Sequence, residues 1–294
     1  MSGPTARPPA GPPVRLRFWG VRGSIPCPGP ATVRYGGNTS CMALELAQGG
    51  QIIFDAGTGI RELARELRRS GKPVTAHLLL THIHWDHIHG LPFFFPLYRE
   101  DTAVTIYGPA HPAGLRGLLE RQMTWEMFPI PPSAQVGLRA VIETGNEPFP
   151  VAGWEVRTQR LCHPGPTQAY RLTSARHDFA YVTDNELAGG AHGVGPAWRD
   201  DLVHFLTGVH TLVHDATWAD DEVDAYSGWG HSCPRQAIML ARDVGCRRLV
   251  LFHHNPEHDD GAMDRHLEQA RSTAAETAPG LEVVAAREGE SLEL

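Results

Sequence analysis

A dense group of metal-binding side chains follows an apolar, strand-like run and constrains this chain more than any other feature. The group is the segment Thr81-His82-Ile83-His84-Trp85-Asp86-His87. Residues two apart in an extended strand point to the same side, so His82 and His84 should share one face. Asp86 and His87 follow where the chain should turn toward a helix, which aims them at a neighbouring point. Imidazole nitrogens and carboxylate oxygens suit zinc, manganese or iron, so the segment predicts a metal site that can hold two ions rather than a solvated polar loop.

The composition is that of a globular protein with an acidic charge balance. The chain has 294 residues, of which 41% are hydrophobic and 20% charged, and this length can bury a substantial core. The net charge of −7 argues against a protein that coats the nucleic-acid backbone, because such surfaces need clustered lysine and arginine. Bound metal ions could still supply positive charge for a phosphate-bearing substrate.

The cysteines and the apolar runs bear on location. The five cysteines are odd in number and lack a CxxC spacing, which predicts a cytoplasmic protein without a disulfide framework. Cys162 beside His163 suits a ligand or nucleophile, or else a small buried side chain, which is the favoured interpretation. No run of eighteen apolar residues is present, so we expect no membrane span. Residues 1–14 are rich in proline and lack an apolar signal region, which predicts a flexible tail before a single domain at 15–294.

Six strand-like runs each end in histidine or aspartate. The residues at these ends are Asp55, His82, His163, Asp184, His214-Asp215 and His253-His254. Polar side chains at the ends of rigid strands are where α/β proteins build sites, whereas turn formation explains only one or two of these endings. Helical spacing over 60–69, 233–244 and 264–277 alternates irregularly with the runs and predicts a mixed α/β fold.

The order of these motifs resembles the signature of the metallo-β-lactamase superfamily. The matching motifs are Phe54-Asp55-Ala56-Gly57-Thr58-Gly59, His82-x-His84-x-Asp86-His87, His163 before Pro164-Gly165, Asp184 in Tyr181-Val182-Thr183-Asp184, and His253 after Leu249-Val250-Leu251-Phe252. The resemblance spans roughly residues 15 to 260. It implies an αββα sandwich, in which two mixed sheets pack face to face with helices outside.

The same resemblance implies ligands for two divalent metal ions. The implied ligands are His82, His84 and His163 for one ion, and Asp86, His87 and His253 for the other. Asp184 would bridge the two ions, and Asp55 would orient ligands from behind them. His253 is chosen over His254 because it directly follows the apolar strand, and strand alternation sends the two rings to opposite faces. Zn²⁺ is the favoured metal, and Mn²⁺ or Fe²⁺ would also suit these ligands.

A second resemblance narrows the class of reaction. Gly230-His231-Ser232 before a helix and His214-Asp215-Ala216-Thr217 resemble segments of the phosphodiesterase branch that includes the tRNA 3′-end-processing ribonuclease, tRNase Z. This resemblance implies that His231 donates a proton to the leaving oxygen or stabilises the phosphorane charge, with Asp215 orienting its ring. In the alternative interpretation, His231 only neighbours a helix cap formed by Ser232.

Two segments bear on substrate size. Residues 112–150 are modestly charged and rich in proline and leucine, so they suit a lid or pocket rim but offer no basic stripe for an RNA helix. A small phosphodiester is therefore preferred over structured RNA as the substrate. Residues 18–26, with Tyr35-Gly36-Gly37-Asn38-Thr39-Ser40, resemble a bacterial group of uncharacterised hydrolases of this superfamily, which does not supply a substrate.

Several side chains near these motifs have two interpretations. The aromatic residues that could stack on a nucleobase are Trp85, Trp229 and residues 93–95, for which packing is favoured. Arg22 could pair with a phosphate or with a carboxylate in a structural ion pair. His89 could contact substrate or serve as a polar helix residue. Residues 258–260 suit a solvated lead-in to a helix.

These observations predict a dinuclear metal hydrolase that cleaves a small phosphodiester, such as a cyclic nucleotide, by metal-bound hydroxide. The expected catalytic residues are Asp86, His231 and Asp215. One alternative is a lactone or thioester hydrolase of the same superfamily, although those branches generally lack the Gly-His-Ser segment. Another is a nuclease that processes RNA ends. A homodimer is possible, because related enzymes often form one.

Overall fold

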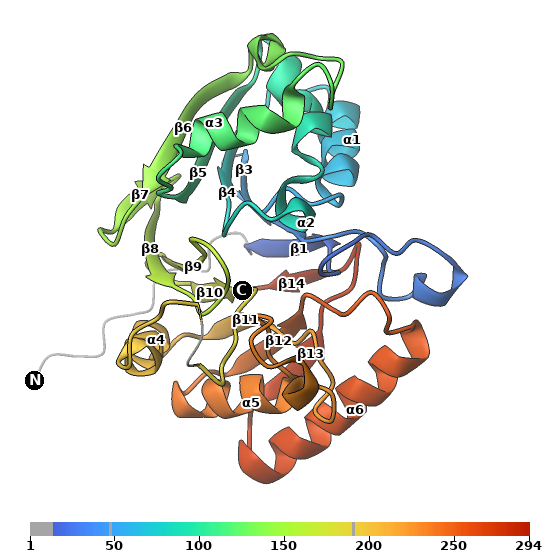
Figure 1. Cartoon of the computed structure of the whole chain (residues 1–294), viewed down its shortest axis with the longest axis vertical. Coiled ribbons are helices and arrows are strands. Elements are labelled where there is room, and N and C mark those ends of the chain that lie inside the picture. The colour runs from blue at the N-terminus through green and yellow to red at the C-terminus, as the bar shows by residue number, and fades with distance from the viewer. Residues whose placement is uncertain (1–13, 47–48, 190–191) are drawn as a thin grey trace, which may run out of the picture.

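The computed structural model describes residues 14–46, 49–189 and 192–294. The predicted tail, residues 1–14, lies outside the described residues except for Val14, and the single domain expected over 15–294 stays a prediction. Two seven-stranded sheets pack face to face, with helices on both outer sides (Figure 1). The predicted α/β class and αββα sandwich are therefore confirmed.

The first sheet has the strand order β14-β1-β2-β3-β4-β5-β6. Its strands are β1 (Arg15–Gly20), β2 (Cys41–Glu45), β3 (Gln51–Phe54), β4 (Thr75–Leu79), β5 (Ala103–Pro109), β6 (Leu138–Thr144) and β14 (Ser291–Glu293). The pairs from β3 to β6 are parallel and the others antiparallel, so the sheet is mixed.

The second sheet has the strand order β13-β12-β11-β10-β9-β8-β7. Its strands are β7 (Phe149–Val151), β8 (Trp154–Arg160), β9 (Gln168–Thr173), β10 (Asp178–Val182), β11 (Thr211–Asp215), β12 (Arg248–Phe252) and β13 (Glu282–Ala285). The pairs from β10 to β13 are parallel and the others antiparallel. The ends of the parallel strands thus meet at a common edge of this sheet.

Strand alternation divides the apolar residues between three layers of core. In β12, Leu249 packs toward the outer helices and Val250 toward the opposite sheet. Between the sheets, the Phe54 ring lies 5.5 Å from Phe179 and 5.6 Å from Tyr181, edge-on to both. Such buried aromatic contacts fix the two sheets against each other and give the strand ends a rigid base.

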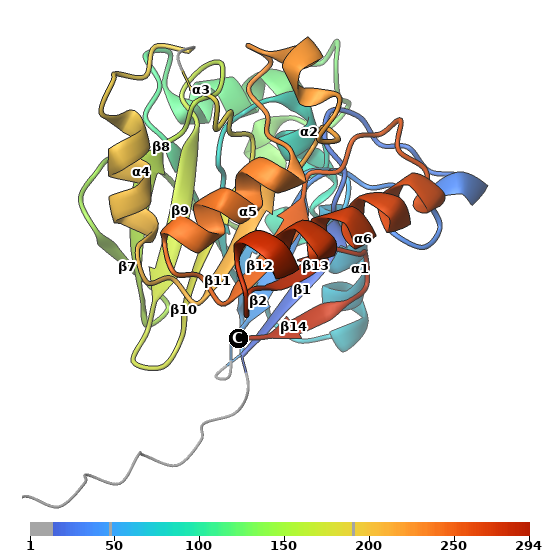
Figure 2. The ribbon, with the colours of Figure 1, turned by 90° about the horizontal axis from the view of Figure 1, so that it is seen from below.

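The helices cover the outer faces of the two sheets. The α-helices are α1 (Ile60–Ser70), α2 (Trp85–Ile88), α3 (Leu115–Glu120), α4 (Trp198–Leu206), α5 (Pro234–Asp243) and α6 (Asp260–Thr277). The short 3-10 helices are η1 (Pro30–Thr32), η2 (Leu91–Phe93), η3 (Phe95–Tyr98), η4 (Arg121–Met123), η5 (Pro132–Ala134) and η6 (Val223–Tyr226). Figure 2 shows α4, α5 and α6 against the second sheet. Within the described residues, no helix is long and apolar enough to cross a membrane.

The predicted helices at 60–69 and 233–244 correspond to α1 and α5, and the third begins earlier than expected. Its first turn is capped by Asp259, whose carboxylate accepts a hydrogen bond from the Ala262 amide at 2.7 Å. The solvated lead-in expected at 258–260 is wrong for two of its residues. Asp260 is buried and accepts hydrogen bonds from the amides of Arg34 and Tyr35, and His258 is also buried.

The interpretation of residues 112–150 as a lid or rim is wrong for much of that segment. Strand β6 and the start of β7 lie within it, and each is the edge strand of its sheet. Helix α3 also lies there and buries Leu115 and Leu119. The longest stretch of this segment without a strand or α-helix is 121–137, between α3 and β6, which includes η4 and η5.

Candidate metal centre

The ends of β3, β10 and β12 turn their polar residues into one site. Asp55 and His253 follow β3 and β12 directly, and Asp184 follows β10 after Thr183; their φ angles are 58°, 61° and 51°. Such left-handed conformations cost on the order of 1–3 kcal/mol each in non-glycine residues. They persist because each side chain is held by several contacts, which indicates that the site is rigid.

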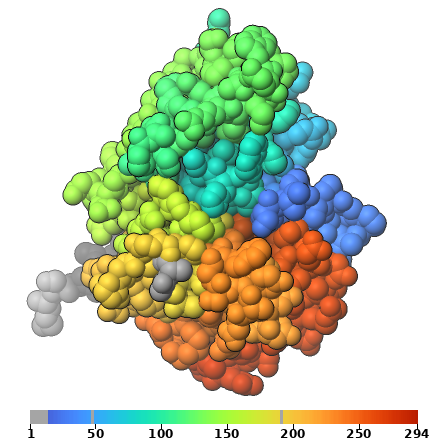
Figure 3. All heavy atoms as spheres, viewed as in Figure 1, coloured from blue at the N-terminus to red at the C-terminus, as the bar shows by residue number. Residues whose placement is uncertain are grey.

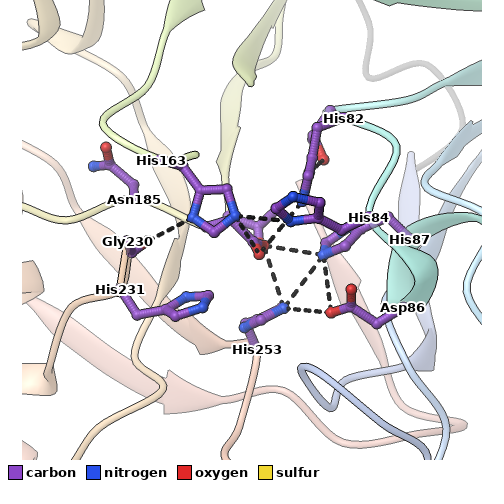
Figure 4. A network of polar contacts seen from close by, with 12 residues as sticks. His82, His84, Asp86, His87, His163, Asn185, Gly230, His231 and His253 are labelled. Carbon is purple, nitrogen blue, oxygen red and sulfur yellow. Dashed lines mark hydrogen bonds and ion pairs between the residues drawn. The ribbon is translucent and has the colours of Figure 1, made fainter. Parts of the chain in front are cut away.

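One group of possible metal ligands consists of three imidazoles. One ring nitrogen from each of His82, His84 and His163 lies within 4.8 Å of the other two (Figure 4). The Nδ1 atom of His163 lies 3.0 Å from the carbonyl oxygen of Gly230, so it carries the proton and leaves the Nε2 lone pair facing His84. His82 donates from Nδ1 to Thr81 Oγ1 at 3.0 Å, and its buried Nε2 has no hydrogen-bond partner among the described residues.

These three imidazoles are suited to a cation because their lone pairs converge. Burial lowers the pKa of His163 to about 4, so its ring is neutral at pH 7. Burial also lowers the pKa of His84, and burial together with the neighbouring His87 ring lowers that of His82. Neutral imidazoles with converging lone pairs fit a divalent ion.

A second group combines carboxylates with imidazoles. Ligand atoms of Asp86, His87, Asp184 and His253 lie within 4.8 Å of one another. The Nε2 atoms of His87 and His253 are 3.3 Å apart. The Nδ1 atom of His87 donates to Asp55 at 2.9 Å and that of His253 to Thr217 at 3.0 Å, which leaves two lone pairs facing each other.

This second group also fits a cation on grounds of charge. Burial alone would lower the pKa of His87. The carboxylates of Asp184, Asp86 and Asp55 outweigh burial and raise that pKa well above its ordinary value. The three buried carboxylates thus attract positive charge to this group, and a divalent ion would take the place of the proton on His87 and balance them.

Asp184 lies between the two groups. Its Oδ1 atom is 3.1 Å from His87 Nε2 and 3.2 Å from His253 Nε2. Its Oδ2 atom is 3.7 Å from the Nε2 atoms of both His82 and His163. One carboxylate oxygen therefore faces each group, which is the arrangement that a bridging ligand needs.

Asp55 holds the cluster from behind. Its carboxylate accepts hydrogen bonds from the Thr81 hydroxyl and amide, from His87 Nδ1 and, at 2.9 Å, from the Tyr181 hydroxyl. Burial and the neighbouring Asp55 raise the pKa of Tyr181, so the phenol stays a donor. Asp55 thereby fixes the tautomer of His87 directly and supports His82 through Thr81.

His231 and Asp215 form a pair beside both groups. The Nδ1 atom of His231 lies 2.7 Å from Asp215 Oδ2, and its ring stacks at 5.0 Å on that of His253. Burial would lower the pKa of His231, but the Asp215 carboxylate outweighs burial and raises the pKa to about 9. Asp215 is fixed in turn by the amides of Thr217 and Asn185, at 2.9 and 3.1 Å. The arrangement can hold a protonated imidazole at neutral pH.

Sequence reasoning missed Glu186, which shapes the backbone before His231. Its buried carboxylate accepts hydrogen bonds from the amides of Gly228 and Gly230, both at 2.9 Å. A Cβ atom on Gly230 would overlap the His163 ring, so only glycine allows this close approach. A lone glutamate whose partners are distant backbone amides leaves no recognisable signal in a sequence.

The segment after β1 also contacts the cluster. The amide of Ser24 donates to Asp86 Oδ2 at 2.8 Å, and Gly23 packs against the His253 ring so closely that a Cβ atom would overlap it. Among the described residues, Arg22 forms no ion pair with a carboxylate. Its buried guanidinium donates to the carbonyl oxygens of Gly36, Asn255 and His258 at 2.7–2.9 Å. Residues 22–24, within the segment 18–26, thus support the site through contacts that involve backbone atoms.

Other expectations near the site have mixed outcomes. His254 donates from Nε2 to the Ala286 carbonyl at 2.9 Å, outside the cluster that contains His253. Cys162 is buried in the core, as favoured. Ser232 is not the helix cap, because α5 is capped by Cys233 and the Ser232 hydroxyl contacts Asn185 and Leu187.

The aromatic residues near the site are more exposed than expected. The prediction that these rings pack in the core is correct for Phe94, which is fully buried. It is wrong for Phe93, whose side chain is 57% exposed. Trp85 is 55% exposed and Trp229 60% exposed, so both lie at the surface instead of in the core. His89 is exposed and its ring lies edge-on to Trp85 at 5.2 Å.

Comparisons with known proteins identify the family and the fold of this chain. A family model described as "Beta-lactamase superfamily domain" matches residues 51–254. The protein named Ribonuclease Z of Synechococcus sp. (strain WH7803) is 27% identical over 270 residues, which cover 76% of this chain and 82% of that protein. The metallo-beta-lactamase fold protein YhfI of Bacillus subtilis superposes with a TM-score of 0.68 at 17% identity, covering 96% of this chain and 100% of that one. A diphosphatase of the PhnP family superposes with a TM-score of 0.67 at 18% identity, covering 96% and 98%.

Proposed function

Because this chain belongs to the metallo-β-lactamase superfamily of metal-dependent hydrolases, in its tRNase Z-like branch, we propose that it hydrolyses a phosphodiester at a dinuclear metal centre. The observation that carries the proposal is the His231–Asp215 pair, which lies beside two groups of converging ligand atoms. A site for two cations with an adjacent protonated imidazole suits a reaction that expels an alkoxide from phosphorus.

The proposed metal ligands divide into two sets. The first is His82, His84 and His163, and the second is Asp86, His87 and His253, with Asp184 shared. When bound, two divalent ions would polarise a phosphoryl oxygen and make a water acidic enough to attack at neutral pH. Zn²⁺ is the proposed metal on the strength of the histidine-rich donors, and Mn²⁺ or Fe²⁺ would fit the same atoms.

The chain's own residues would position the substrate and move the proton. His231 would hold a proton on Nε2, since Nδ1 is engaged by Asp215, and would give it to the leaving oxygen. One ligand atom of His231 lies within 4.8 Å of atoms of His163 and Asp184, so the donor is within reach of a phosphate held at the cluster. Asp86, which the Ser24 amide holds in place, would orient the attacking water.

We favour a small diester, such as a cyclic nucleotide, over structured RNA. Support comes from the net charge of −7 and from residues 112–150, which are built into sheet edges and α3 and provide no basic arm. RNA-end processing is the second candidate, because the relative with 27% identity is named Ribonuclease Z. We further propose a cytoplasmic location, supported by an odd number of cysteines without a CxxC spacing. A homodimer stays a prediction.

Hydrolysis of bis-p-nitrophenyl phosphate, compared with a lactone and a thioester, tests the reaction class. The protein should be assayed with its metal content quantified, after chelation and after metal is restored. We expect diester turnover that disappears with chelator and returns with metal. Turnover of lactone or thioester alone, with two metals bound, would contradict the proposal. A panel of cyclic nucleotides against a 3′-extended tRNA then separates the two substrate classes.

A further inference from the structure

Two exposed tryptophans lie close in sequence to a histidine of the site. Trp229 is 60% exposed and is separated from His231 by Gly230 alone, while Trp85 is 55% exposed and follows His84. Figure 3 shows teal atoms of the segment around residues 85–98 and orange atoms around residues 220–235 on one face of the molecule, on either side of the boundary between its halves. The question is what these indoles bind.

The backbone on both sides of Trp229 is fixed to the cluster. Gly228 and Gly230 have φ angles of 85° and 86°, and the buried Glu186 carboxylate accepts hydrogen bonds from both amides at 2.9 Å. The Gly230 carbonyl in turn accepts a hydrogen bond from His163 Nδ1 at 3.0 Å. These contacts, which also place Gly230 against His163, hold the backbone of Trp229 in one conformation, and such preorganisation lowers the cost of binding a ligand.

Neighbouring rings also hold the Trp229 indole in place. Trp218 and Tyr226 stack with their centroids 3.8 Å apart and their planes within 4°. Trp229 lies nearly perpendicular to both, at 6.1 Å from Trp218 and 5.4 Å from Tyr226. Trp218 also lies edge-on to His231 at 6.3 Å. The exposed indole therefore belongs to a packed aromatic group that reaches the proposed proton donor.

Trp85 follows another histidine of the ligand cluster. It is the first residue of α2, its ring lies edge-on to His89 at 5.2 Å, and its neighbour in the chain, His84, is exposed and lies 5.0 Å from the His163 ring. The His163 ring also lies 5.2 Å from the His231 ring. The rings of His84, His163 and His231 are thus neighbours in that order (Figure 4). In the chain, Trp85 comes directly after the first of these three histidines and Trp229 two residues before the last.

We propose that Trp85 and Trp229 are stacking subsites for planar nucleobases on the two ester arms of the substrate. This narrows the small diester to a dinucleotide, because both ester oxygens of a cyclic nucleotide belong to one nucleoside with a single base. This inference rests on the proposed phosphodiesterase function, because a phosphodiester has two arms that leave the phosphate on different sides. Trp229 serves the leaving-group arm, since it adjoins the residue that would protonate that oxygen, and Trp85 serves the retained arm. In a chain of net charge −7, base stacking rather than phosphate contacts would supply the affinity.

Three matched substrates test the inference: a dinucleoside monophosphate and two analogues that each lack one base. Product analysis identifies the leaving arm. We expect Trp229→Ala to lower kcat/KM by roughly 5- to 150-fold for substrates with a base on the leaving-group arm. The kcat/KM for the analogue that lacks this base should not change. Trp85→Ala should show the same pattern for the retained arm. Trp229→Phe should keep most of the activity, because a phenyl ring still stacks.

The control is Trp125→Ala, which removes an indole that is 73% exposed and has no ring contact with the cluster among the described residues. Equal losses on all three substrates would overturn the subsites in favour of a structural role, and so would unchanged kinetics. Turnover of bis-p-nitrophenyl phosphate in the same preparations separates the two proposals. If that diester is hydrolysed without any preference for bases, the subsites fail and the phosphodiesterase stands. If it is not hydrolysed, both fail.

A binding experiment checks the same inference without turnover. Adenosine monophosphate and ribose 5-phosphate differ only in the base, so their affinities for the metal-loaded protein report stacking directly. We expect the nucleotide to bind more tightly by roughly 5- to 150-fold, and Trp229→Ala or Trp85→Ala to reduce that ratio. Equal affinity of the two compounds for the unaltered protein would overturn the inference.

Discussion

Asp184 faces both groups of ligand atoms with a single carboxylate, through Oδ1 on one side and Oδ2 on the other. If it bridges two ions, Asp184→Asn should remove the shared negative charge and reduce metal content below two ions per chain. Diester turnover should fall by roughly 100-fold or more. Metal analysis after gel filtration checks this, with Asp178→Asn as the control, because Asp178 begins β10, the strand that leads to Asp184, but pairs with Arg171 instead. Full metal content in the Asp184 variant would refute the bridging role.

His231 should matter most when the leaving group needs a proton. We expect His231→Asn to lower turnover of an alkyl or nucleoside diester by about 10²- to 10⁴-fold while two metals remain bound. The loss should be much smaller for bis-p-nitrophenyl phosphate, because p-nitrophenolate leaves without protonation. Comparing the two substrates in one preparation measures the effect. If metal is lost instead, His231 is a ligand and not an acid.

At the residue scale, the sequence predicted what carries a chemical pattern and missed what acts through the backbone. The spacing of histidine and aspartate located the side chains that the structure brings together, and the position of His253 directly after the apolar strand distinguished it from His254. The carbonyl partners of Arg22 were not predicted and Glu186 was missed, because these partners are backbone groups far along the chain. Residue type does not reveal such partners.

Strand ends and the segments beside them set the geometry of the site. Gly23, in the segment after β1, lies against the His253 ring. Gly23→Ala should push that ring out of place and weaken metal binding by the second group, with roughly a 10- to 100-fold loss of affinity. Competition with a chromogenic chelator measures this. Gly29→Ala in the same segment is the control, because a Cβ atom there meets nothing within 4 Å. Equal affinities in the two variants would contradict the positioning role.

At the element scale, central strands were easier to predict than edge strands. Residues 52–54 and 249–252 are continuous apolar runs because both of their faces are buried, and they form most of β3 and β12. Strand β6 is half exposed along most of its length, and β7 has only three residues with a proline among them. Their weak apolar pattern explains why residues 112–150 suggested a lid. The early start of α6 depended on a single cap, Asp259.

The charge of the whole molecule predicts how activity responds to salt. With a net charge of −7, a small diester should be hydrolysed with a kcat/KM that changes less than about 10-fold between 50 and 200 mM salt. A protein that makes six to ten phosphate contacts would instead lose roughly 10³–10⁵ in affinity over that range. Kinetics at the two ionic strengths decide between these cases. A steep decline with salt would favour a long RNA as the substrate.

At the scale of the whole molecule, the αββα architecture followed from a resemblance carried by five spaced motifs, and the two mixed sheets confirm it. Composition and periodicity alone supported only a mixed α/β fold. The strand order, and the way both sheets deliver their ends to one edge, depend on pairings between distant segments, such as β14 with β1. Local sequence patterns do not encode these pairings.

Titration of the metal-free protein with one divalent metal, followed by turnover of bis-p-nitrophenyl phosphate, tests the central claim most directly. The account predicts that activity rises to a plateau at two equivalents per chain, because one ion is held by His82, His84 and His163 and the other by Asp86, His87 and His253. A plateau at one equivalent, or no diester turnover at two, would contradict it.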